Sequence, residues 1–154
     1  MDLRRSGLMP EFDHIGYAVR NVDDKKELME DLLGFKFAER KEYDRGGVKA
    51  RLDFYETPGG LMELVEVSDP GAPINQFIES RGEGVHHICL RVDDIRQTMA
   101  EWESKGVKFT MKPPRYGSRN GLITFADPST TGGLLTELVQ YLKEGEEIPD
   151  WAQQ

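Results

Sequence analysis

The sequence predicts an α+β fold made of two tandem copies of one strand–helix–strand–strand–strand (βαβββ) module. The segment DHIGYAVRNVDDKKELMEDLLGFKF, which starts at Asp13, resembles HHICLRVDDIRQTMAEWESKGVKF, which starts at His86. Self-similarity of this kind is the signature of repeated structural units. Three pairs of equivalent residues recur at offsets of 72 to 74 positions, namely Gly34 and Gly106, His14 and His87, and Glu63 and Glu137. The nearly constant offset indicates a duplication.

Each copy contains one helical pattern between a pair of aspartates and a glycine. Aspartate is a favoured N-cap because its side chain accepts a hydrogen bond from the first helical turn, and glycine favours the helix end. The apolar residues between them recur at helical spacing. The expected caps and ends are Asp23 or Asp24 with Gly34 in the first copy, and Asp93 or Asp94 with Gly106 in the second.

Segments with strand character surround each helix. They are rich in β-branched and aromatic residues and are bounded by turn-forming residues. The predicted strands cover residues 12–19, 35–43, 48–55 and 61–67 in the first module, and residues 85–92, 107–111, 122–125 and 134–141 in the second.

A chain of 154 residues suits one domain with a shared core. Proline and glycine mark a connector between the modules, which also holds a short helical turn. The acidic tail breaks at Pro149 and is expected either to be a mobile end or to pack Trp151 on a partner subunit. The predicted single domain spans residues 1–154, with module one at about 11–67, the connector at 68–83, module two at about 84–141 and the tail at 142–154.

Composition excludes several classes of function. The net charge is −8 and the basic residues form no stripe along the sequence, so nucleic acid is not an expected partner. No segment reaches the roughly 20 apolar residues that cross a bilayer, so a membrane is not expected either. The single cysteine, Cys89, forms no internal disulfide, and the start MDLRRSGLMPEF lacks the apolar run of a signal peptide. A cytoplasmic protein is the expectation.

Four repeat-related residues form a candidate metal site. Strand alternation places His14 and His87 on equivalent faces of their strands, away from the faces expected to meet the helices. Glu63 and Glu137 lie within apolar strands, where a carboxylate is costly unless it meets a cation or hydrogen-bond donors. Two imidazoles and two carboxylates suit one divalent ion such as Co, Ni, Mn, Zn or Fe. The predicted metal ligands are therefore His14, Glu63, His87 and Glu137.

Neighbouring polar residues have simpler interpretations. His86 has the opposite strand parity from His87 and is interpreted as structural. Cys89 shares the face of His87, but a lone thiol is usually a small buried apolar group. The segment 113–121 holds Arg115 and Arg119, which suit a substrate carboxylate or phosphate, or form an ordinary solvated turn.

The pattern as a whole resembles the vicinal-oxygen-chelate (glyoxalase/bleomycin-resistance) superfamily, and within it the methylmalonyl-CoA epimerases. The resemblance covers about residues 12–141, and its most specific stretches are DHIGYAV, GAPINQFIESRGEGVHHICLRVDDI and PSTTGGLLTEL. It implies paired βαβββ modules that form a partly closed mixed sheet around a metal, and a homodimer. The family's metal ligands fall on His14, Glu63, His87 and Glu137, and the first glutamate position also admits glutamine.

The loop before the last strand supports the epimerase branch, although the chain departs from that branch in two places. Glu137 lies ten positions after Asp127, as in similar epimerases. Many epimerases have His-Pro-Lys-Ser where this chain has Asp127-Pro128-Ser129-Thr130. The best match to their second catalytic glutamate is Ala50, with Asp53 or Glu56 as substitutes.

The resemblance implies an isomerase that acts on a small-molecule substrate, expected to be an acyl-CoA. The reaction would be epimerisation of methylmalonyl-CoA or a related 2-acyl thioester by proton transfer through a metal-stabilised enolate. Glu137 would be the catalytic base as well as a metal ligand. A glyoxalase-I-like lyase or isomerase of a thiol hemiacetal is the alternative, with which Glu63 is compatible. A non-catalytic small-molecule-binding member of the superfamily is the third interpretation.

Overall fold

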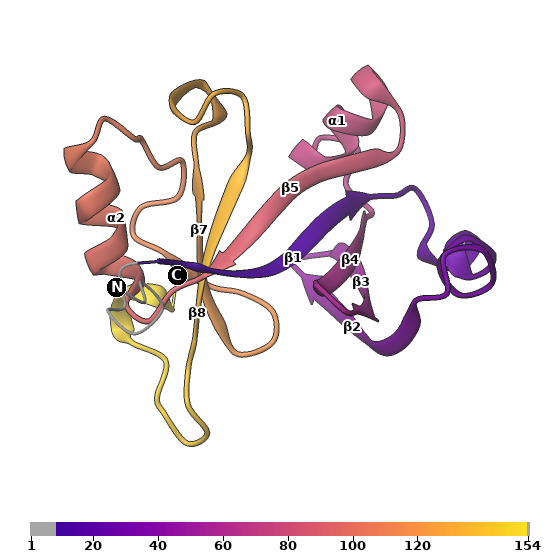
Figure 1. Ribbon diagram of the computed structural model, residues 1–154, viewed down its shortest axis with the longest axis horizontal. Helices are drawn as coiled ribbons and strands as arrows, with labels where there is room; N and C mark the ends of the chain where they lie inside the picture. Colours follow the sequence, from indigo (N-terminus) through magenta and orange to yellow (C-terminus); the bar gives the residue numbers. More distant parts are fainter. Residues whose placement is uncertain (1–8, 154) are drawn as a thin grey trace. The chain divides into compact units, whose positions relative to one another are not determined.

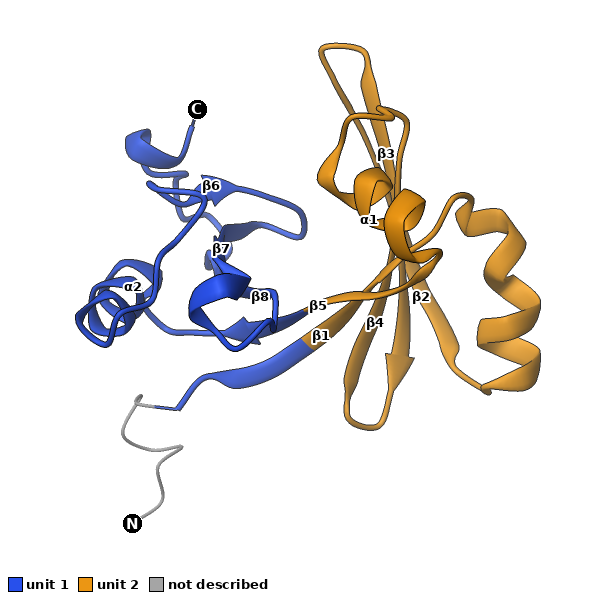
Figure 2. Ribbon diagram, turned by 90° about the horizontal axis from the view of Figure 1, so that it is seen from above, with its two compact units in different colours: residues 1–13, 88–154 blue, residues 14–87 orange. Residues whose placement is uncertain are grey.

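The computed structural model describes residues 9–153, and the chain divides into two compact parts. One part is His14–His87, and the other combines the residues up to Asp13 with those from Ile88 onward (Figure 2). We call them the 14–87 part and the 88–153 part, and describe each by itself. Strands β1 (Glu11–Ala18) and β5 (Gly84–Arg91) each contribute residues to both parts.

The strands of the 14–87 part follow the order β2-β3-β4-β1. Strands β2 (Lys36–Arg45), β3 (Val48–Thr57) and β4 (Gly60–Val67) are antiparallel neighbours, whereas β1 and β4 run parallel. The β2–β3 hairpin turns through Gly46 and Gly47, which both have positive φ, at 61° and 87°. A two-residue hairpin turn of type I′ requires this conformation at both positions, and glycine adopts it without strain.

The first predicted helix exists, but its cap and its type differ from the prediction. It consists of a 3-10 turn, η2 (Val22–Lys25), followed by a π-helix, η3 (Glu27–Leu32). The cap is Asn21, whose side-chain oxygen accepts a hydrogen bond from the Asp23 backbone N–H. Asp23 is wrong as the cap because its carboxylate instead binds Arg40 and Arg51, at 2.8 and 2.6 Å.

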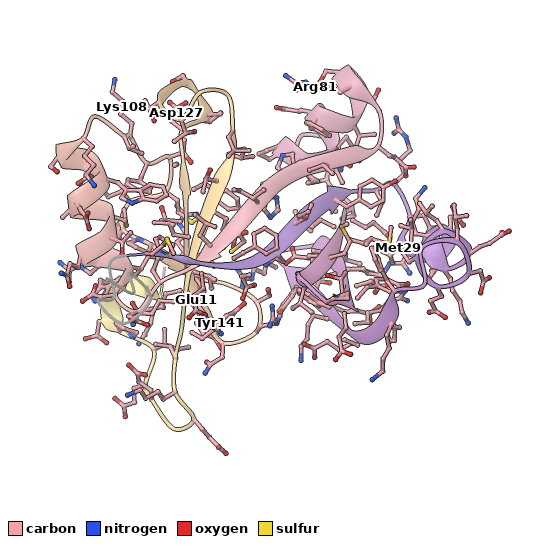
Figure 3. The ribbon with its side chains drawn as sticks, viewed as in Figure 1. Glu11, Met29, Arg81, Lys108, Asp127 and Tyr141 are labelled. Carbon is pink, nitrogen blue, oxygen red and sulfur yellow. The ribbon has the colours of Figure 1, made fainter. Side chains whose placement is uncertain are left out.

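Strand alternation divides β1 between two faces, and the face of Tyr17 and Val19 meets the first helix as predicted. Tyr17 and Val19 face a cluster with η2 and η3 that includes Val22 and Met29, and Met29 is labelled in Figure 3. On the other face, Ala18 packs against Ile74 and Ile78 of helix α1 (Pro73–Arg81), which forms within the predicted connector. His14 and Gly16 share the parity of Ala18, so they lie on the α1 side of the strand.

The 88–153 part repeats this topology, with the strand order β5-β8-β7-β6. Figure 1 labels β5, β7 and β8, and Figure 2 labels β6 as well. Strands β6 (Arg115–Tyr116), β7 (Gly121–Ala126) and β8 (Thr136–Tyr141) are antiparallel neighbours, whereas β5 and β8 run parallel. Helix α2 (Ile95–Ser104) begins at Asp94, whose side chain accepts from the Gln97 backbone N–H, as predicted. Leu90 and Val92 face α2 and pack with Ile95 and Met99.

Two predictions for this part are wrong. The strand expected at 107–111 is reduced to an isolated bridge between Phe109 and Ala126, because Pro113 and Pro114 come shortly after it and supply no N–H to extend the pairing. The tail is not a mobile end over 148–152. Trp151 packs against the core of this part and Ala152 is buried, since burying a large apolar ring is favourable.

The α+β class and the duplicated topology are confirmed, and the predicted boundaries of modules, connector and tail stay a prediction. Among the described residues, no helix is long and apolar enough to cross a membrane. The prediction that the chain lacks a signal peptide falls largely on residues 1–8, which lie outside the described residues.

The ion pair between Arg40 and Asp53 leads to a prediction about stability. Arg40 binds Asp53 through Nε and Nη2 at 2.6 and 2.8 Å, and Asp53 is only 2% exposed. Arg40→Ala should lower the free energy of unfolding by about 3 kcal/mol, because it leaves a buried carboxylate without this cation. Urea denaturation measures the change. The exposed pair of Lys105 with Glu101 is the control, since Lys105→Ala should cost less than about 1 kcal/mol. Equal losses would contradict the prediction.

Candidate metal centre

His14 and Glu63 are brought together by the parallel pairing of β1 and β4. Gly16 is the register partner of Glu63, and His14 lies two residues earlier on the same face of β1. The His14 Nε2 atom lies 3.1 Å from Glu63 Oε2. Both residues are buried, at 4% and 8% exposed. Two residues that are 49 positions apart in the sequence therefore bring a ring nitrogen and a carboxylate oxygen into contact.

His87 completes a group of three buried residues within the 14–87 part. Its ring centroid lies 5.5 Å from that of His14, with the rings at 79° to each other, and the residue is 5% exposed. The ring occupies the space over Gly16, where a Cβ atom would lie 2.0 Å from His87 Cε1. Glycine at position 16 therefore makes room for the second imidazole.

The donor set and its geometry fit a divalent cation. Ligand nitrogen and oxygen atoms lie about 2.1 Å from such an ion, so two ligands at a right angle are about 3.0 Å apart. The 3.1 Å between His14 Nε2 and Glu63 Oε2 matches this separation. Two imidazoles with a carboxylate also form a set suited to borderline divalent metals. Three of the four predicted ligands are thus buried within one part, and two of them, His14 and Glu63, have the spacing of neighbouring metal ligands.

Glu137, the fourth predicted ligand, belongs to the 88–153 part. It is 7% exposed and lies on β8, where its register partners are Cys89 on β5 and Phe125 on β7. The two residues that follow it in the strand, Leu138 and Val139, are apolar and buried. The expected burial of this carboxylate is therefore confirmed, and so is the burial of the Cys89 side chain.

The candidates for a second catalytic carboxylate lie on different faces of strand β3. Asp53 pairs in register with Leu64, whereas Phe54 pairs with Glu63, so Asp53 points to the face opposite Glu63. Its carboxylate there binds Arg40, which makes Asp53 wrong as a substitute base. Ala50 and Glu56 have the parity of Phe54, but Ala50 has no ionisable group and the Glu56 carboxylate lies 3.5 Å from Lys36 Nζ.

The arginine-containing segment is anchored rather than an ordinary solvated turn. Arg119 adopts positive φ, its Nη1 lies 3.4 Å from Asp13 Oδ1, and its guanidinium lies 5.1 Å from the Tyr141 ring centroid. The Tyr141 hydroxyl donates to the same Asp13 oxygen at 2.9 Å. Burial and the Asp13 charge raise the pKa of Tyr141, so its hydroxyl keeps the proton that it donates. Arg115, in contrast, is exposed on β6.

Asp127, where the sequence departs from many epimerases, has a local structural role. Its carboxylate accepts from the Ser129 backbone N–H at 2.9 Å and caps the short 3-10 helix η4 (Pro128–Thr130). That hydrogen bond, followed by one from the Ser129 side chain, lowers the pKa of Asp127. Its backbone N–H donates to the Lys108 carbonyl, and Figure 3 labels both residues at the same end of β7.

His86 is the functional candidate that the sequence interpretation missed. Its Nδ1 atom lies 3.0 Å from His87 Nδ1, although adjacent residues of a strand normally point to opposite faces. The pair of consecutive histidines was the available signal. The alternation of side chains along a strand, taken by itself, argued against a contact between the two rings.

The space that Gly16 leaves for the His87 ring leads to a prediction about metal binding. Gly16→Ala should weaken divalent-metal binding by roughly 10- to 100-fold, because the new methyl group must displace the His87 ring. Titration with Co²⁺ in a calorimeter measures the affinity. Gly84→Ala is the matched control, since a Cβ atom there meets nothing within 4 Å. Wild-type affinity in the Gly16 variant would show that the position of the His87 ring does not matter for metal binding.

The chain is similar in sequence to a known family and to known enzymes. A model of the family described as "Glyoxalase/Bleomycin resistance protein/Dioxygenase superfamily" matches residues 13–125. The mitochondrial methylmalonyl-CoA epimerase of Bos taurus is 26% identical over 129 residues, which cover 83% of this chain and 73% of that protein.

Two solved structures resemble the chain over most of its length. The methylmalonyl-CoA epimerase from Mycobacterium tuberculosis has a TM-score of 0.78 at 29% identity, covering 87% of this chain and 89% of that chain. A variant of the Streptomyces coelicolor methylmalonyl-CoA epimerase, in complex with 2-nitronate-propionyl-CoA, has a TM-score of 0.74 at 30% identity. It covers 86% of this chain and 98% of that one.

Proposed function

We propose, from the premise that this chain belongs to the glyoxalase/bleomycin resistance protein/dioxygenase superfamily, that it is a metal-dependent epimerase of methylmalonyl-CoA or a related 2-acyl thioester. The observation that carries the proposal is the buried group of His14, Glu63 and His87. The relatives support the same reaction, since the bovine, mycobacterial and Streptomyces proteins are methylmalonyl-CoA epimerases that match most of this chain.

The ion would be held by His14, Glu63, His87 and Glu137. Strand register supports the inclusion of Glu137, because His87 and Cys89 share one face of β5 and Glu137 is the register partner of Cys89. Neighbouring partners in a sheet point to the same face, so Glu137 has the parity of His87. When bound, a divalent cation would stabilise the negative charge that develops on the substrate oxygens.

The side chains of the chain would bind the ion and move the proton. Glu137 would serve one face of the carbon between the thioester and the carboxylate, and would take the proton there from one epimer or deliver it there to form that epimer. The burial of His14, Glu63 and His87 keeps water from their ligand atoms, which strengthens electrostatic interactions there. Epimerisation also requires proton delivery to the opposite face of the substrate, which Ala50 cannot provide.

Isotope exchange tests the proposal. Protein supplied with Co²⁺ should convert one epimer of methylmalonyl-CoA into the mixture of both in deuterium oxide, with deuterium incorporated at the α-carbon. Mass spectrometry and circular dichroism measure the two changes. A chelator should abolish both, and added metal should restore them.

The same experiment distinguishes the alternatives. Absence of exchange together with turnover of methylglyoxal and a thiol would assign the chain to the glyoxalase reaction. Binding of an acyl-CoA without either reaction would indicate a non-catalytic member. The homodimer and the cytoplasmic location stay predictions.

A further inference from the structure

The contact between His86 and His87 gives His86 a role in the site. Both residues lie on β5, where strand geometry alone would direct their side chains apart. Instead, their Nδ1 atoms approach to 3.0 Å and the rings stand at 87° to each other. The His86 ring is itself held by Phe77 of α1, whose ring meets it edge-on with centroids 5.0 Å apart. The contact therefore links α1 to the buried imidazole of His87.

A close contact between two ring nitrogens limits which nitrogen of each ring can carry the proton. A hydrogen bond between two Nδ1 atoms needs one N–H donor and one lone-pair acceptor. An imidazole that coordinates a metal through Nε2 is neutral and carries its proton on Nδ1. His87 would then donate from Nδ1 to His86, and His86 would carry its own proton on Nε2.

We propose that His86 is a positioning residue that selects the Nδ1–H tautomer of His87, so that the Nε2 lone pair is available to a divalent cation. This inference rests on the proposed metal centre. Since Nδ1 of His87 is occupied by His86, Nε2 is the ring nitrogen left for an ion. The ring is held against rotation by the close approach of Gly16 on one side and by His86 on another.

Two substitutions separate the hydrogen bond from the shape of the ring. His86→Phe keeps an aromatic ring against Phe77 but removes the acceptor, and should weaken Co²⁺ binding by roughly 10- to 100-fold. His86→Asn keeps an acceptor oxygen near the position of Nδ1, and should retain the affinity within a few-fold. Phe77→Leu is the matched control, since it removes the ring contact and leaves the hydrogen bond.

A second measurement needs no metal. Nitrogen NMR of the metal-free protein at mildly alkaline pH should show His87 protonated on Nδ1 in the wild type, and as a mixture of tautomers in His86→Phe. Unchanged affinity and tautomer in His86→Phe would overturn the proposal, as would an equal loss in the Phe77 variant. Failure of the wild type to bind metal would instead refute the proposed metal centre, and the NMR result would still decide the tautomer.

Discussion

Replacing His87 with alanine should reduce the bound divalent metal from about one ion per chain to almost none. His87 is buried beside His14 and supplies one of the two imidazoles of the candidate centre. Substituting residues that only orient metal ligands typically costs 10- to 100-fold in affinity, so the loss of a ligand itself should exceed about 100-fold. Elemental analysis of protein purified without chelator measures the stoichiometry.

A matched control comes from the same strand. Cys89 lies two residues beyond His87 on the same face of β5 and is also buried, but it is interpreted as a small apolar residue. Cys89→Ala should therefore keep the metal. Retention of metal at wild-type affinity in His87→Ala would remove the basis of the centre, and loss of metal in Cys89→Ala would identify the thiol as a ligand.

Replacing Glu137 with glutamine should lower kcat for epimerisation by about 10²- to 10⁴-fold, the range typical of losing a general base. An amide oxygen can still approach a cation but cannot accept the α-proton. Deuterium uptake into methylmalonyl-CoA should fall in parallel with kcat, while the metal content should fall much less. A large loss of proton transfer with a small loss of bound metal would identify Glu137 as a base.

Glu63→Gln is the control for this experiment because it makes the same chemical change at the other carboxylate. The resemblance to the superfamily implies that glutamine is accepted at the position of Glu63, so this variant should keep its activity within about tenfold. Comparable losses of kcat in both variants would mean that the carboxylates act only through the metal. Glu137 would then lose its assignment as the base.

The duplicated topology could be predicted from the sequence because it depends on periodicities within single segments. Alternation along β1 assigned Tyr17 and Val19 to the face that meets the first helix, and their cluster with Val22 and Met29 confirms it. The strand predicted at 107–111 failed because strand pairing also depends on the neighbouring residues, and the two prolines at 113 and 114 end it. The cap of the first helix failed because arginines from β2 and β3 engage Asp23.

The sequence by itself determined which residues carry the chemistry: two imidazoles and two carboxylates at equivalent places of a repeat. Only the tertiary structure decided how the residues of the 14–87 part meet. The register of β1 on β4 places Glu63 beside His14, and the register of β3 on β4 turns Asp53 away. The structure also sets the His87 ring over Gly16 and brings His86 to its Nδ1 atom. These contacts depend on side-chain directions and on pairing between distant segments, whereas periodicity reports only the face on which each residue lies.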